Sequence, residues 1–227
     1  MTREQYHLLE SYVRQSMDDG AHGADHVYRV LYIAMDIAKA EQKVDYDVLI
    51  AACLLHDIAR REQSQGLVKC HAAAGAEKAR AFLLEQGWDE TFAHKVAHAI
   101  RSHRFSVTRE PESLEAKILF DADKVDVTGL MGVARTLQYG GEKGEPLYTL
   151  GADGLPSPGA VEEPPSFFQE YKRKLERLYD RFYTVRGRQL AEDRRRAAGA
   201  FRDALWCEVD TAYAGLALVE AALEESV

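Results

Sequence analysis

The chain has 227 residues, enough to bury a sizeable core without disulfides or other cross-links. A net charge of −8, with 46% hydrophobic and 29% charged residues, describes an ordinary globular protein and gives no general reason to expect nucleic-acid binding. No apolar run reaches the roughly 18 residues of a membrane span, the N-terminus resembles neither a secretory signal nor a transit peptide, and three scattered cysteines do not form a disulfide framework. We therefore expect a cytoplasmic protein with no membrane partner.

Helical spacing of apolar residues dominates the chain, and the sustained alternation that is typical of strands is absent. A helix is predicted to begin near Ala24, because one stripe recurs at i, i+4, i+7 and i+11: His26, Val30, Ile33 and Ile37. Asp45 is the expected N-cap of the next helix, whose apolar stripe ends on His56 and Asp57. Further helices are predicted over 71–87, over 89–103 and, as one or two elements, over 112–138.

Glycine and proline are frequent from Gly140 to Pro165, which predicts a long loop and a candidate lid. Two more helices are predicted over 166–184 and 186–225. No repeat appears, so we expect an all-α fold. It would be a single domain over residues 1–227, a bundle of roughly eight helices, with a core region at about 19–139, the loop at about 140–165 and C-terminal helices at about 166–227.

The segment from Lys172 to Arg196 contains ten Lys/Arg residues and only four acids. The favoured interpretation is a solvated helix face that pairs with the acidic tail after it, and a phosphate-binding or nucleic-acid-binding patch is the alternative.

Polar residues interrupt three of the apolar stripes, at His26, at His56 and at Asp123. A single histidine on an apolar face is more often a satisfied core residue than a ligand. Two imidazoles and two carboxylates, counting Asp57, instead suit a divalent cation such as Mn²⁺, Fe²⁺, Co²⁺, Ni²⁺ or Zn²⁺. Such a cation would neutralise the buried aspartates, which are costly to bury unpaired.

The order of these residues, together with the segments HGADHVYRVLYIA, AACLLHDIA, AIRSHRF and DADKVDVTGLMGVARTLQYGG, resembles the HD-domain metal-dependent phosphohydrolase superfamily. Within it the chain is similar to small standalone bacterial hydrolases, from about Asp19 to about Glu208. The resemblance implies an all-α HD domain whose divalent metal, Mg²⁺ being a further candidate, is held by four residues: His26, His56, Asp57 and Asp123.

Asp123 is chosen among the three aspartates of DADKVD because the family's final ligand precedes a basic residue, here Lys124. Asp121 is about 200° away around a helix and should not share its face. Asp126, one turn further on, is expected to hold a ligand imidazole or a water.

Some branches of the family bind two metals. His71 in HAAAG and His103 in IRSHRF resemble the positions of their additional histidines, so both are candidates for a second metal or a phosphate contact. His98 is the alternative to His103.

The resemblance implies a water, activated by the metal, that attacks phosphorus. The candidate catalytic residues are Asp57 together with Lys124 and Arg60, which would stabilise charge on the phosphoryl oxygens, and Glu62, which would orient or deprotonate the water. Arg61 is an alternative to Arg60. The chain departs from the pattern at Arg60, where relatives often carry an acid.

The resulting hypothesis is a hydrolase that cleaves a phosphate ester or anhydride in a small phosphorylated substrate, first of all a nucleotide. A non-catalytic regulator that binds metal and nucleotide is the alternative. Nucleic-acid binding through residues 172–196 is a weaker third reading, and oligomeric state has no signal in the sequence.

Overall fold

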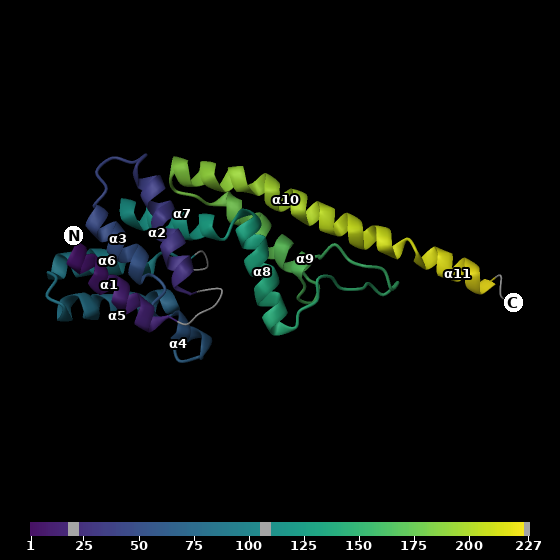
Figure 1. Ribbon diagram of the computed structural model, residues 1–227, viewed down its shortest axis with the longest axis horizontal. Helices are drawn as coiled ribbons and strands as arrows, with labels where there is room; N and C mark the ends of the chain where they lie inside the picture. Colours follow the sequence, from purple (N-terminus) through teal and green to yellow (C-terminus); the bar gives the residue numbers. More distant parts are fainter. Residues whose placement is uncertain (18–22, 105–109, 225–227) are drawn as a thin grey trace. The chain divides into compact units, whose positions relative to one another are not determined.

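The computed structural model describes residues 1–17, 23–104 and 110–224 (Figure 1). These residues form helices and connecting segments with no strand, only an isolated bridge between Leu150 and Pro156, so the predicted all-α class is confirmed. None of the helices in this part of the chain combines the length and apolar character needed to cross a membrane. The predicted start of the core near residue 19 lies outside the described residues.

The chain divides into two compact units. Unit 1 comprises Met1–Asp126 and Arg181–Leu190, and unit 2 comprises Val127–Asp180 and Ala191–Val227. The expectation of one domain over the whole chain stays a prediction.

Unit 1 holds seven helices among its described residues: α1 (Arg3–Ser16), α2 (Ala24–Ala38), α3 (Tyr46–Leu55), α4 (Arg60–Ser64), α5 (His71–Glu85), α6 (Glu90–Arg101) and α7 (Leu114–Asp126). Local sequence explains where several of them begin. The Asp45 carboxylate accepts the backbone N–H of Val48, as predicted, and Asp89 caps α6 in the same way through Phe92. Thr2 and Gln5 form a capping box at α1.

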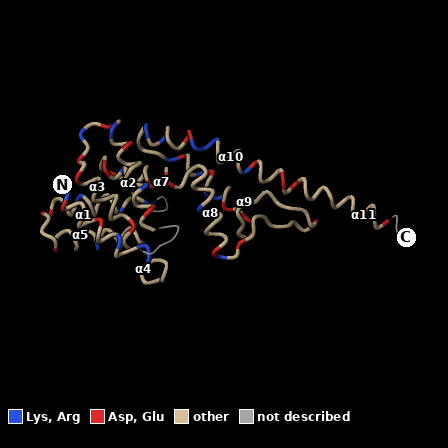
Figure 2. The backbone as a smooth tube through the Cα atoms, in the orientation of Figure 1, with Lys and Arg blue, Asp and Glu red and all other residues tan. Residues whose placement is uncertain are grey.

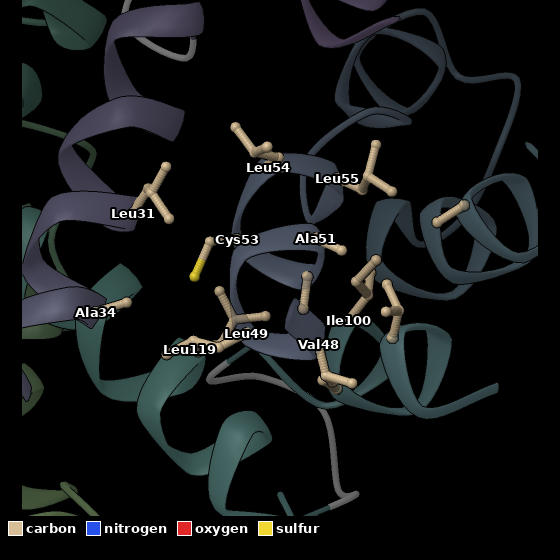
Figure 3. Packing of buried hydrophobic residues seen from close by; sticks show 14 of the residues in the cluster. Leu31, Ala34, Val48, Leu49, Ala51, Cys53, Leu54, Leu55, Ile100 and Leu119 are labelled. Atoms are coloured by element: carbon tan, nitrogen blue, oxygen red, sulfur yellow. The ribbon is translucent and has the colours of Figure 1, made fainter. Parts of the chain in front are cut away.

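The core of unit 1 is built around α3, which packs against α1, α2, α5, α6 and α7. Seven of its ten residues are buried, because the segment is apolar on every side. Figure 3 shows Leu49, Cys53 and Leu54 of this helix among side chains of its neighbours. His56 and Asp57, which directly follow α3, therefore lie in the interior of unit 1.

Unit 2 contains α8 (Gly129–Lys143), α9 (Phe167–Glu170), a π-helix (Tyr171–Leu175), a 3-10 helix (Glu176–Asp180), most of α10 (Val185–Tyr213) and α11 (Leu216–Glu224). Its smaller core gathers seven buried residues: Val133, Phe167, Phe168, Tyr171, Leu175, Leu178 and Ala198.

Three boundaries differ from the predictions. The helix α8 passes through Gly140 and Gly141 and ends only at Gly144, whose φ of 69° is the left-handed conformation of a C-cap, so the loop begins later than expected. The segment 166–184 forms short α, π and 3-10 pieces instead of one helix. The last predicted helix is interrupted at Ala214 and Gly215.

Candidate metal site

Six predicted site residues meet in unit 1, brought together from five parts of the chain. The α2–α7 pair supplies His26 and Asp123, the turn after α3 supplies His56 and Asp57, and the α5–α6 pair supplies His71 at its start and His103 just beyond its end. Five of these residues are buried: His26, His56, Asp57, His71 and His103. Asp123 retains 14% exposure of its side chain, so the cluster opens toward solvent on its side.

One group of ligand atoms surrounds His26. Its Nε2 atom lies 3.4 Å from His56 Nε2, 3.4 Å from Asp123 Oδ1 and 3.8 Å from Asp57 Oδ2. Two ligands bound about 2.1 Å from one cation at near-tetrahedral or octahedral angles lie roughly 3.0–3.4 Å apart. His26, His56 and Asp123 could therefore hold a metal ion, and each pair of their ligand atoms is within 4.8 Å.

A second group shares Asp57. His56, Asp57 and His103 also offer ligand atoms within 4.8 Å of one another. Asp57 Oδ1 lies 3.1 Å from His71 Nε2 and 3.6 Å from His103 Nε2, and these two nitrogens are 3.3 Å apart. The two oxygens of Asp57 thus face different histidine pairs, Oδ2 toward His26 and His56 and Oδ1 toward His71 and His103.

Hydrogen bonds fix which nitrogen of each imidazole faces the centre. Nδ1 of His56 lies 2.7 Å from the Cys53 carbonyl and Nδ1 of His103 lies 2.6 Å from the Ile100 carbonyl. A carbonyl only accepts, so each Nδ1 must donate, and the neutral rings then present the Nε2 lone pair to the aspartates. His26 Nδ1 is 2.8 Å from the Asp126 carboxylate, which directs that ring in the same way.

The donor set consequently fits a divalent cation. Asp57 Oδ1 is buried and has no hydrogen-bond partner among the described residues, although the Nε2 atoms of His71 and His103 lie 3.1 and 3.6 Å away. Lone pairs of nitrogen and oxygen that converge at these distances repel one another unless a positive charge lies among them. Mixed imidazole and carboxylate donors suit the divalent transition metals.

Electrostatics at the site are dominated by burial and by the aspartates. Complete burial lowers the pKa of His56 to about 4, against the opposing attraction of Asp57. Burial would raise the pKa of Asp57 and of Asp123, but neighbouring imidazoles, with Lys124 foremost beside Asp123, hold both well below the usual value. Burial lowers the pKa of His26, yet Asp123 and Asp126 overcome it and raise the pKa. The cluster therefore attracts positive charge.

Asp126 makes two contacts, and the sequence predicts only the one with His26. Asp126 accepts from His26, as expected of a residue that holds a ligand imidazole, and it also accepts from Arg29 Nε at 2.7 Å and Nη2 at 3.2 Å. Arg29 was missed in the sequence, where the only available signal is its position one turn after His26 on α2.

The other predicted catalytic residues have distinct surroundings. Lys124 is buried and its Nζ lies 2.7 Å from Asp123 Oδ2. Arg60 lies over His71, with Nη1 within 3.1 Å of both ring nitrogens, and its Nε is 3.9 Å from Asp57 Oδ2. Glu62 pairs with Lys78, while Arg61 and Glu62 both belong to the short helix α4.

His98 and Asp121, the two residues weighed against His103 and Asp123, have other partners in the structure. His98 pairs with Glu112 at 3.3 Å, whereas His103 faces Asp57. Asp121 points to another part of unit 1, where it accepts from the backbone N–H groups of Tyr183 and Thr184.

Five of the ten Lys/Arg residues of the stretch 172–196 form ion pairs, with acids that lie outside the acidic tail of the favoured interpretation. Within unit 2, Arg173 and Lys174 pair with Glu170, and Arg195 pairs with Glu192. Within unit 1, Arg181 pairs with Glu110 and Arg186 with Asp36.

A buried cluster of four imidazoles and two aspartates in a helical unit is the kind of site that metal-dependent hydrolases use. Comparison with known proteins agrees. The family model of the HD domain matches residues 23–128. A crystal structure of a predicted HD superfamily hydrolase from an uncultured Thermotogales bacterium is 31% identical, with a TM-score of 0.58, over 91% of this chain and 91% of that chain.

The chain is also similar to YpgQ of Bacillus subtilis, with 29% identity over 199 residues, which cover 84% of this chain and 87% of that protein. The crystal structure of YpgQ in complex with ADP shares the fold, with 24% identity and a TM-score of 0.70 over 90% of this chain and 98% of that chain. The chain belongs to the HD-domain phosphohydrolase superfamily, and the resemblance seen in the sequence is confirmed.

Proposed function

We propose that the protein hydrolyses a phosphate ester or anhydride bond of a nucleotide, with a divalent cation held by His26, His56, Asp57 and Asp123. One observation carries the proposal: imidazole nitrogens converge in a buried site with a carboxylate oxygen of Asp57 that has no hydrogen-bond partner in the described part of the chain. When bound, the cation would lower the pKa of a water and polarise a phosphoryl oxygen. The contacts of His71 and His103 with Asp57 Oδ1 support a second cation or a phosphate contact there.

Cationic side chains on two sides of the cluster support a phosphorylated substrate. Lys124 lies beside Asp123, and Arg60 lies beside Asp57 and His71. Both would stabilise negative charge that develops on phosphoryl oxygens, Arg60 through its planar guanidinium.

Glu62 remains the proposed group that orients or deprotonates the water. Partial burial opposes its ionisation, but the Lys78 ammonium lowers the pKa of Glu62, which keeps it in the form that can accept a proton. A nucleotide is the proposed substrate because the similar YpgQ was crystallised with ADP.

The test compares His56→Ala and Asp57→Asn with the parent, using a panel of nucleotides and Mn²⁺. We expect both variants to lose bound metal and at least about 100-fold in turnover, while circular dichroism shows an unchanged helical content. His94→Ala is the matched control, because His94 is an exposed histidine on α6. A metal-free His56→Ala protein that hydrolyses at the parent rate would contradict the proposal.

A non-catalytic regulator that keeps the site to bind metal and nucleotide is the second candidate. The observation that favours it is Arg60, a cation beside Asp57 at a position where the sequence resemblance leads one to expect an acid. Saturable nucleotide binding without release of phosphate or pyrophosphate across the panel would decide for the regulator.

A further inference from the structure

The amide of Gln63 makes two hydrogen bonds that only one of its orientations allows. Its Nε2 donates to the Lys69 carbonyl at 3.0 Å, and its Oε1 lies 2.5 Å from His71 Nδ1. A carbonyl only accepts, so the NH2 group must face Lys69 and the amide oxygen must face the imidazole. His71 Nδ1 therefore has to donate, and it carries the ring proton.

The Nε2 atom of His71 then presents a lone pair to the cluster. It lies 3.1 Å from Asp57 Oδ1 and 3.3 Å from His103 Nε2. The latter atom is also an acceptor, because Nδ1 of the His103 ring donates to the Ile100 carbonyl. His103 Nε2 is in turn 3.6 Å from Asp57 Oδ1. Three acceptor atoms thus form a triangle, and none of the three brings a proton to it.

Arg60 does not favour the opposite tautomer of His71. It is one of three charged residues in a row on α4 (Figure 2). Its Nη1 is 2.9 Å from Nδ1 and 3.1 Å from Nε2 of the imidazole, so it lies over the face of the ring and not in line with one lone pair. A proton on Nε2 would leave two acceptors, Nδ1 and Gln63 Oε1, 2.5 Å apart, which is costly. The cation over the ring also disfavours an imidazolium.

We propose that Gln63 is a positioning residue, which holds the Nε2 lone pair of His71 toward Asp57 and His103, so that this side of the cluster binds a cation and not a phosphate oxygen. The inference rests on the proposed function and decides between the two ligands named there. A phosphate oxygen would add a fourth acceptor to the triangle. A cation with bonds of about 2.1 Å fits among acceptors that are 3.1–3.6 Å apart.

The first test measures the tautomer by NMR of the metal-free, full-length protein with 15N-labelled histidine, at about pH 8, where an ordinary imidazole is neutral. The signals of His71 are those missing from His71→Asn. We expect the proton on Nδ1 in the parent. Gln63→Met should shift it toward Nε2, which can then donate to His103. Gln63→Glu retains an acceptor and should retain the tautomer.

Gln65→Met is the matched control, because Gln65 is an exposed glutamine at the end of the same short helix. It should leave the ring shifts of His71 unchanged. A parent protein with the His71 proton on Nε2 would overturn the proposal, and so would a Gln63→Met protein with the tautomer of the parent.

The second test adds ligands to the same labelled protein. An excess of Zn²⁺ should shift the Nε2 signals of His71 and His103, whereas inorganic phosphate alone should shift neither. Gln63→Met should weaken binding of Zn²⁺ at His71 about 10-fold or more, as loss of an outer partner does in other metal sites, and leave binding at His26 unchanged.

The outcomes separate this inference from the proposed function. Zn²⁺ that shifts His26 and His56 but not His71 would overturn the inference and leave the proposed function standing. A shift of His71 Nε2 by inorganic phosphate would overturn it in the same way. Zn²⁺ that shifts none of the cluster's histidines would contradict both.

Discussion

Asp126 connects the proposed metal ligand His26 to the guanidinium of Arg29. Burial disfavours its ionised form, yet His26 and Arg29 lower the pKa of Asp126 to about 2. The carboxylate therefore stays charged near neutral pH. As an anion it keeps the proton of His26 on Nδ1, so that Nε2 remains available to a cation. Asp126 acts on the metal through His26 and is a positioning residue.

We predict that Asp126→Asn weakens metal binding about 10- to 100-fold, as loss of such outer partners does in other metal sites. The amide is neutral and cannot oblige His26 Nδ1 to donate. The measurement is titration of the metal-free protein with Mn²⁺, followed by the EPR signal of the free ion. Circular dichroism is the control for the fold. If the spectrum is unchanged, a loss of metal affinity cannot be due to a loosened fold.

Glu85→Gln is the matched control for this prediction, because it removes the same charge from an exposed position on α5. Equal metal affinity in Asp126→Asn and in the parent would show that Arg29 and Asp126 serve the fold alone.

The sequence predicts those site residues that are polar while their neighbours on the same helix face are apolar. His26, His56 and Asp123 stand out because each interrupts an apolar stripe, and all three lie in the cluster. Arg29 does not stand out, since an arginine on a partly exposed helix face needs no explanation. Gln63, whose Oε1 lies 2.5 Å from His71 Nδ1, is likewise an ordinary polar residue until the fold brings α4 to the start of α5.

The start of α10 is fastened to α7 by a buried carboxylate. Asp121 accepts from the N–H groups of Tyr183 and Thr184 and from the Thr184 hydroxyl, at 2.6–3.1 Å. Gly187 allows this approach, because a Cβ there would lie 2.6 Å from Asp121 Oδ2 and 2.7 Å from Thr184 Oγ1. The contact holds residues of the 181–190 segment in unit 1, against the helix that carries Asp123.

We predict that Gly187→Ala destabilises the protein by about 1–3 kcal/mol, because the added methyl must displace the carboxylate or the hydroxyl. Gly199→Ala, in the same helix with open space around the position, should instead stabilise it by up to about 1 kcal/mol through helix propensity. Urea denaturation followed by circular dichroism measures both. Equal effects of the two substitutions would refute the steric argument.

The predicted helices are confirmed where the local sequence carries a long apolar stripe or an N-cap residue. The helices α2 and α3 were predicted from a long apolar stripe and from the Asp45 cap. The five-residue helix α4 was missed, because it is too short for a periodic pattern. Gly140 and Gly141 cause the opposite error, because they predict that α8 ends too early. They weaken a helix without ending it, and α8 stops only where Gly144 takes a positive φ.

Each unit of the molecule carries one of the two tryptophans. Trp88 packs against the core of unit 1 and Trp206 against the core of unit 2. The single-tryptophan variants Trp206→Phe and Trp88→Phe therefore report the unfolding of unit 1 and of unit 2 separately. All the proposed metal ligands belong to unit 1. A metal that binds only the folded site should stabilise unit 1 directly.

We predict that Mg²⁺ or Zn²⁺ at about 100 times its dissociation constant stabilises unit 1 by about 2.7 kcal/mol. This corresponds to roughly 5–10 °C in the melting temperature for a domain of this size. The measurement is thermal unfolding followed by the fluorescence of Trp88, before and after chelation. Asp57→Asn should abolish the shift. A metal-dependent shift seen by Trp206 and not by Trp88 would place the ion in unit 2 and refute the assignment, because binding stabilises first the unit that contains the ligands.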